Sequence, residues 1–163
     1  MAISLRRFLV VQALMLWQGG FLFYTAAVVP AGTTLLGAAG QGAITARVTE
    51  VLNAVGTIAL AVLALELALT RDPNRRRVAC RWWAWAVALL GQVLLVYFHV
   101  LLDAFMDEGR TRVVIREPFY PVHRMYLWAC TVQWAACLLL TWWTLRAWRE
   151  EDVSAGRPRA GLE

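Results

Sequence analysis

The sequence of 163 residues contains no lysine, only two serines and only two histidines. Both serines, Ser4 and Ser154, lie in the terminal segments, and the chain has no GxSxG, HExxH or P-loop motif. Nothing therefore supports serine hydrolase, zinc protease or nucleotide-binding chemistry. No catalytic motif marks the chain as an enzyme.

Cysteine is also scarce, with Cys80, Cys130 and Cys137 as its three positions. Their number and spacing exclude a secreted disulfide framework and a CxxC metal knuckle. We expect all three to be small packing residues.

What the chain has in abundance is apolar sequence: 60% of its residues are hydrophobic, and its mean hydropathy is +0.55. A helix of about 20 apolar residues crosses a bilayer. Four stretches meet this length, at residues 8–29, 51–69, 82–105 and 125–148. The pattern predicts an all-α protein, a four-helix transmembrane bundle built from residues 1–149.

The segments outside these spans differ in character. Residues 31–50 are rich in Gly, Ala and Thr, and we expect them to form a short helix at the outer interface. Residues 150–163 are polar and have no apolar periodicity, which predicts a disordered cytoplasmic tail. Residues 1–7 resemble the start of a signal peptide, but the apolar run after them is as long as a full span, so we expect an uncleaved first helix.

Arginine supplies all of the positive charge, and the net charge is +5. Eleven of the 16 arginines lie in the N-terminal segment, the second loop and the C-terminal segment. The positive-inside rule then places both termini in the cytoplasm, in agreement with an even number of spans. Because the arginines flank apolar spans, the expected partner is the lipid bilayer and not a nucleic acid.

Polar residues form one stripe on each of the last two spans. Gln92, His99 and Asp103 are separated by seven and four residues, which places them along one side of a helix. The fourth span repeats this with spacings of three and four residues, at His123, Tyr126, Cys130, Gln133 and Cys137. Because unsatisfied polar groups are costly in hydrocarbon, both stripes should face the bundle interior.

The helical rise sorts the polar residues by depth. We expect the polar lining to consist of Gln18, Gln92 and Gln133 near mid-membrane, Asn53 nearer the outer side, and Glu66 near the inner side. His99, Asp103 and His123 join Asn53 in the outer group.

Three interpretations of the outer group stay open. In the first, His99 and His123 hold a haem or a transition metal, and Asp103 is either a further oxygen ligand or a hydrogen-bond acceptor that orients a histidine. In the second, His99 and Asp103 relay protons or ions along a route whose inner end is Glu66. In the third, His99 and Asp103 hydrogen-bond each other, His123 meets lipid headgroups, and the glutamines fix helix packing.

Two short sequence patterns resemble those of a known group of membrane proteins. They are the run Trp17-Gln18-Gly19-Gly20-Phe21 with Tyr24 and Pro30, and the later run Phe119-Tyr120-Pro121 with His123-Arg124. They resemble bacterial four-helix inner-membrane proteins, distant relatives of the copper resistance D family and of a eukaryotic family linked to platinum-drug resistance. The resemblance implies a bacterial inner-membrane protein with a periplasmic-side polar site that handles a metal. The four methionines of this chain form no cluster, so copper transport is not predicted.

The sequence thus predicts a small transport or accessory unit with an outer-side polar site. Two alternatives remain: a haem- or metal-binding redox subunit of a larger membrane complex, and a purely structural subunit. Other membrane subunits, or further copies of the same chain, are the protein partners that these functions imply.

Overall fold

The structure, a computed structural model, describes residues 2–107, 109 and 112–155, and its regular elements are helices. Three helical stretches are long and apolar enough to cross a membrane: Ile3–Leu69, Arg75–Asp103 and Arg116–Ser154. The all-α prediction is confirmed. The elements are α1 (Ala2–Leu14), η1 (Met15–Gly19), α2 (Gly20–Phe23), η2 (Tyr24–Val28), α3 (Val29–Leu69), α4 (Arg75–Asp103) and α5 (Arg116–Ala155).

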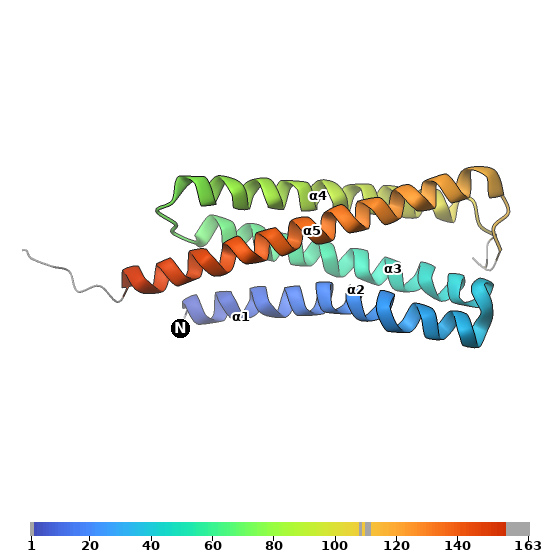
Figure 1. Cartoon of the computed structure of the whole chain (residues 1–163), viewed down its shortest axis with the longest axis horizontal. Helices are drawn as coiled ribbons and strands as arrows, with labels where there is room; N and C mark the ends of the chain where they lie inside the picture. The colour runs from blue at the N-terminus through green and yellow to red at the C-terminus, as the bar shows by residue number, and fades with distance from the viewer. Residues whose placement is uncertain (1, 108, 110–111, 156–163) are drawn as a thin grey trace, which may run out of the picture.

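The first helical stretch reverses direction at Gly37. This residue has φ 72° and ψ 170°, a backbone conformation that is open to glycine and strained for other residues. Residues 2–36, the first limb, run away from the N-terminus, and residues 38–69, the second limb, return beside them (Figure 1). A single residue therefore makes the turn between two long antiparallel limbs.

Contacts along the two limbs show how they are aligned. Near the N-terminus, Arg6 Nη1 donates to the carbonyl of Leu69 at 3.2 Å. Close to the turn, Tyr24 Oη and Thr45 Oγ1 hydrogen-bond at 2.9 Å. Arg6 and Leu69 lie 31 and 32 residues from Gly37, whereas Tyr24 and Thr45 lie 13 and 8 residues from it, so only the pairing near the N-terminus is symmetric about the turn.

This arrangement corrects two expectations about the first limb. We expected the first span to end at Pro30, but the helix continues to the reversal at Gly37. The π-helical turn η2 ends two residues before Pro30, in the turn of helix where proline removes a backbone hydrogen bond. Nor do residues 31–50 form a separate interfacial helix, because they extend both limbs.

The two later helices are longer than the predicted spans. Helix α4 begins after Asn74, whose side chain caps it by accepting from the backbone N–H groups of Arg76 and Arg77 at 3.1 and 3.2 Å. Helix α5 continues to Ala155. Residues 150–155 of the expected tail are therefore helical, and residues 156–163 lie outside the described part of the chain.

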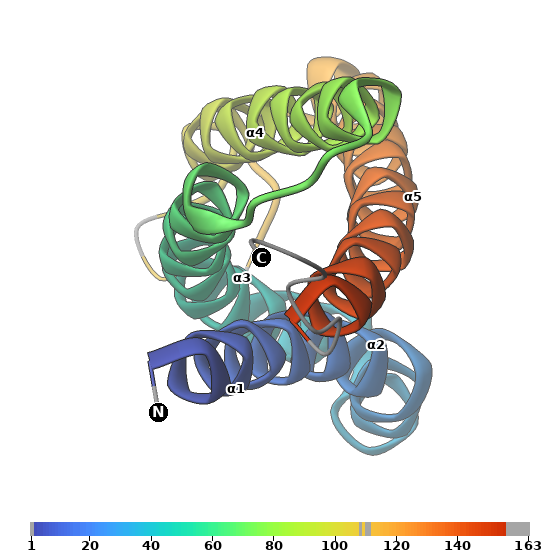
Figure 2. The same cartoon turned by 90° about the vertical axis from the view of Figure 1, so that its left-hand side faces the viewer.

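We call the end that carries Ala2, Leu69 and Ala155 the inner end, after the predicted topology, and the end that carries Gly37 the outer end. The packed core lies in the inner half, where Leu63, Ala88 and Leu140 are fully buried. Figure 2 looks along the bundle from the inner end, with the helices arranged around this core.

The outward faces of the helices are strongly apolar. Leu16, Phe23, Leu90 and Trp128 are each at least 60% exposed. Such large exposed apolar surfaces mark contact with lipid or with other apolar partners. They agree with the membrane class that the composition predicts.

Candidate functional site: a cavity in the outer half

A cavity of about 900 Å³ lies in the outer half of the bundle. Both limbs, α4, α5 and the connection between α4 and α5 line it. Its size is in the range of sites that hold small molecules, roughly 300 to 1,000 Å³. The predicted lining residues Gln18, Asn53 and Gln133 are among its wall residues, as are His99, Asp103 and His123.

The first limb faces the cavity through its two π-helical turns. Trp17 and Gln18 belong to η1, and Tyr24 and Thr25 belong to η2; all four line the cavity. π-Helical turns are rare and occur frequently at functional sites. Their placement here marks this wall as the distorted side of an otherwise regular helix.

The aromatic and hydroxyl part of the wall was missed at the sequence level. Tyr24 Oη accepts a hydrogen bond from Gln41 Nε2 at 3.0 Å and is bonded to Thr45, so the two limbs share a polar network near the turn. Gln41 is 4% exposed. To predict this network from the sequence, one would have had to place residues 31–50, which include Gln41 and Thr45, inside the bundle.

Glutamine side chains connect α3, α4 and α5 at the inner side of the cavity. Gln133 Nε2 on α5 donates to Gln92 Oε1 on α4 at 2.9 Å, and Gln92 Nε2 donates to the carbonyl of Asn53 on α3, also at 2.9 Å. We call this the amide ladder. Gln92 does not line the cavity, but it holds Gln133 and Asn53, which do.

Gln18 approaches the same region from η1. Its Oε1 atom is buried and has no hydrogen-bond partner among the residues that the structure describes. A buried amide oxygen costs free energy when nothing donates to it. The cavity thus offers an acceptor for a donor group of a ligand or a water molecule.

An acidic and imidazole group lies at the outer side of the cavity. His99 Nε2 is 3.6 Å from Asp103 Oδ2, one helical turn along α4. Glu50 on the second limb joins them, and one ligand atom from each residue lies within 4.8 Å of the other two. Imidazole together with carboxylates is a donor set that suits divalent transition metals.

His123 is placed differently from His99. Its ring stacks on that of Phe119, with centroids 5.8 Å apart and planes 6° from parallel. It lines the cavity but is not part of the group formed by Glu50, His99 and Asp103. A haem held by both histidines, and a metal site that includes His123, stay predictions.

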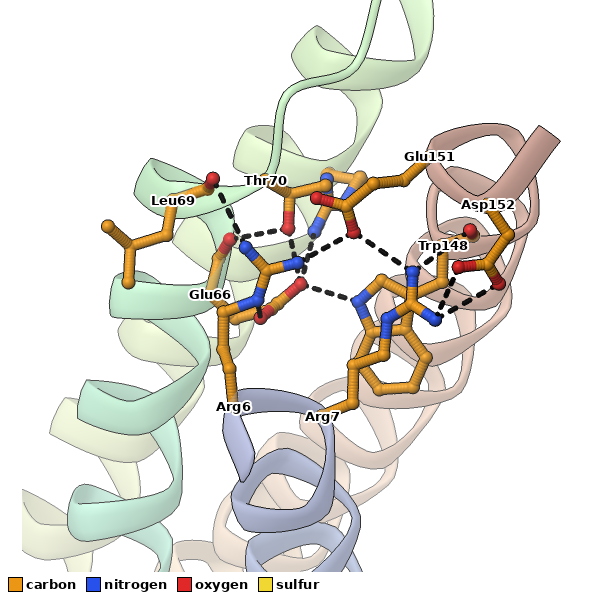
Figure 3. Close-up of polar contacts among 9 residues, drawn as sticks. Arg6, Arg7, Glu66, Leu69, Thr70, Trp148, Glu151 and Asp152 are labelled. Carbon is orange, nitrogen blue, oxygen red and sulfur yellow. Dashed lines mark hydrogen bonds and ion pairs between the residues drawn. The ribbon is translucent and has the colours of Figure 1, made fainter. Parts of the chain in front are cut away.

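Glu66 lies apart from the cavity, at the inner end (Figure 3). Its side chain is fully buried, and it accepts from Trp148 Nε1 at 2.5 Å and from the Thr70 hydroxyl. Arg6 Nε lies 2.8 Å and Arg81 Nη2 3.9 Å from its carboxylate oxygens. One carboxylate thus connects the first limb, the second limb, α4 and α5.

Further ion pairs surround Glu66. Glu151 lies 2.7 Å from Arg6 and 3.0 Å from Arg7, so the start of the chain is fastened to the end of α5 (Figure 3). Arg77 pairs with Asp72 and, at 2.6 Å, with Glu150. We call Glu66 and these paired residues the inner ion cluster.

The ion cluster also sets the protonation of Asp72, which lies in the connection between α3 and α4. Burial alone would raise the pKa of Asp72. Hydrogen bonds from the Arg77 side chain and the Asn74 backbone, together with nearby arginine charge, lower it below its ordinary value instead. Asp72 therefore remains a carboxylate at neutral pH.

Comparisons with known proteins add no relative: no protein-family model, curated protein or solved structure significantly matches this chain. The resemblance to copper resistance D-like proteins therefore stays a prediction. The site must be interpreted from its own residues.

Proposed function

We propose that this protein is a four-span integral membrane protein of the bacterial inner membrane that binds a small ligand in its outer cavity and serves as an accessory unit. The observation that carries the proposal is a cavity lined by polar and aromatic groups, present in the outer half and separated from the inner end by tightly packed residues.

The reversal at Gly37 supports a four-span topology. Each limb has more than 30 helical residues, a length of roughly 45 Å at about 1.5 Å per residue. That exceeds the roughly 30 Å hydrocarbon core. Each limb is thus long enough to cross, and with α4 and α5 the chain crosses four times and keeps both termini on the cytoplasmic side, as the arginine distribution favours.

Packing between the cavity and the inner end favours binding over transport. A substrate leaving the cavity inward would have to pass the amide ladder, then the core around Leu63 and Leu140, then the inner ion cluster. Buried charges that lose their partners are costly, as is opening a packed core. An accessory unit needs no such route.

The native cysteines provide a direct test. Cys130 lines the cavity, Cys137 lies about two turns further inward in the core at 1% exposure, and Cys80 is exposed near the start of α4. Three variants that each keep one cysteine, with serine at the other two positions, can be treated with a membrane-impermeant methanethiosulfonate cation in oriented membrane vesicles.

We expect Cys130 to react only with reagent on the outer side, Cys80 only with reagent on the inner side, and Cys137 with neither. The Cys137 variant is the control for non-specific opening of the bundle. Labelling of Cys80 from the outer side would reverse the topology. Protection of Cys130 from both sides would remove the open outer cavity on which the proposal rests.

A second candidate function is binding of a divalent transition metal, favoured by the close approach of Glu50, His99 and Asp103. The fourth position needed by a metal would come from a ligand or from water. Metal analysis of purified protein loaded with Zn²⁺ tests it. We expect His99→Ala and Asp103→Asn to lower the bound metal and His123→Ala to leave it unchanged; equal metal in all four proteins would exclude this site.

A further inference from the structure

The charges at the inner end fall into two classes that the sequence does not separate. The described part of this end contains nine arginines and five acidic residues. The arginines are Arg6, Arg7, Arg71, Arg75, Arg76, Arg77, Arg81, Arg146 and Arg149; the acids are Glu66, Asp72, Glu150, Glu151 and Asp152.

All five acidic residues form ion pairs with arginines of the same end. Glu66, Glu151 and Asp152 pair with arginines of the first limb, and Asp72 and Glu150 pair with Arg77. The four arginines that contact these acids are Arg6, Arg7, Arg77 and Arg81. Their ion pairs hold the helices together at the inner end.

Five arginines remain on the outside, and we call them the rim arginines: Arg71, Arg75, Arg76, Arg146 and Arg149. All five are exposed. They form no ion pair with any residue that the structure describes, and Arg146 instead lies over the Trp142 ring at 4.9 Å. No acid among the described residues of this end is left to neutralise them.

The rim arginines are close to an aromatic belt. Trp82 and Trp83 follow at the start of α4, 39% and 73% exposed, and Trp142 on α5 is 54% exposed. Exposed tryptophans mark the headgroup level of a membrane. The pairing of Arg77 with Glu150 holds the start of α4 and the end of α5 at the same level, so both sets of rim arginines reach this depth.

The outer end is different. Its described residues contain four arginines and four acidic residues, which balance. Among the residues that the structure describes, the excess positive charge therefore lies at one end and, at that end, on the arginines that form no ion pair.

We infer that the rim arginines form an interaction surface for anionic phospholipid, with guanidinium groups on the headgroup phosphates and the neighbouring tryptophans against the upper acyl chains. Guanidinium groups match phosphate oxygens in geometry as well as in charge. This inference does not depend on what the outer cavity binds.

Native mass spectrometry of the detergent-solubilised full chain tests the surface. The protein is incubated with equimolar phosphatidylglycerol and phosphatidylcholine of identical acyl chains, and the bound lipids are counted. The test variant is Arg75→Gln/Arg76→Gln, which keeps the length and helix propensity of both side chains. The matched control removes two exposed arginines of the outer end, Arg47→Gln/Arg124→Gln.

We expect the wild type and the control to retain phosphatidylglycerol preferentially. The test variant should retain it about 25-fold more weakly, at about fivefold for each arginine. Its helical circular dichroism should be unchanged, because neither side chain has a partner among the described residues.

Four results would overturn the inference. The wild type could bind both lipids equally, or the two variants could lose phosphatidylglycerol equally, which would reduce the effect to net charge. Displacement of phosphatidylglycerol by millimolar inorganic phosphate, or by a short RNA duplex, would show a site for free anions or for nucleic acid instead of a lipid surface.

Discussion

Replacing Gly91 by alanine should separate α4 from α5. A Cβ atom built on Gly91 would lie 2.8 Å from the Cβ of Gln133 and 3.5 Å from its Cα. These atoms belong to or adjoin the backbone of α5, so no side-chain rotation relieves the contact. The helices must move apart at the level of the amide ladder.

The cost can be worked out from this contact. Overpacking a core by one methyl group costs about 1 to 3 kcal/mol. Gln133 also donates to Gln92 Oε1 at 2.9 Å and to the carbonyl of Ala88 at 3.2 Å, and each weakened hydrogen bond adds about 1 kcal/mol. The higher helix propensity of alanine returns up to about 1 kcal/mol. We expect a net loss of about 2 to 4 kcal/mol.

Equilibrium unfolding in detergent micelles, followed by circular dichroism as the denaturing detergent is increased, measures this difference. Gly19→Ala is the matched control, because nothing lies within 4 Å of its Cβ position. The control should be neutral or slightly more stable than the wild type. If Gly91→Ala is as stable as Gly19→Ala, the close approach of α4 and α5 described here is refuted.

Three further outcomes are expected in the same unfolding assay. Glu66→Gln leaves the buried guanidinium of Arg81 without a charged partner and should cost about 3 to 5 kcal/mol, whereas Glu50→Gln, with an exposed ion pair, should cost less than about 1 kcal/mol. Folding lowers the pKa of Asp72, so the stabilisation of the protein by ionised Asp72 is complete above the ordinary pKa of 3.8 and is lost as the pH falls through the folded-state pKa. Asp72→Asn should therefore flatten the dependence of stability on acid pH. An unchanged pH profile in this variant would contradict the prediction. Gly37→Ala places a side chain at φ 72° and should cost about 1 to 3 kcal/mol, and a neutral result would show that the limbs can turn elsewhere.

The helices and their polar stripes could be predicted because both depend on local periodicity. His99 and Asp103 are four residues apart on one helix, and the structure brings their side chains to 3.6 Å. Gln92 and Gln133 were both predicted to face the bundle interior, because unsatisfied polar groups are costly in hydrocarbon, and the structure brings them together across α4 and α5. Local periodicity gives the side of the helix on which each glutamine lies; it does not give the partner that each glutamine meets on the other helix.

The course of residues 31–50 could not be predicted in the same way. Their Gly, Ala and Thr content is compatible with an interfacial helix, with a loop or with two helix ends. In the structure these residues form two helix ends. Gly37 at positive φ makes the turn between them, and the hydrogen bond of Tyr24 with Thr45 joins the two limbs. Long-range pairing of this kind leaves no periodic trace in the sequence.

Glu66 shows the same limit for charge. Its sequence position indicated a polar residue near the inner side, and one interpretation made it the inner end of an ion route. The sequence contained no information on which arginine would meet it. Arg6 comes from α1, Arg81 from α4 and Trp148 from α5. The contacts of Glu66 are therefore those of a residue that holds several helices together.

The two halves of the bundle are stabilised by different forces, and this difference explains how the outer half can remain hollow. Apolar helices gain little from the hydrophobic effect inside lipid, so their association depends on close packing and on polar contacts. The middle of the bundle provides the close packing, through the approach of Gly91 to Gln133, and the inner end provides the polar contacts, through the ion cluster around Glu66. Because these contacts hold α4, α5 and both limbs at one end, the outer half can spread apart and keep polar groups such as Gln18 Oε1 available to a ligand.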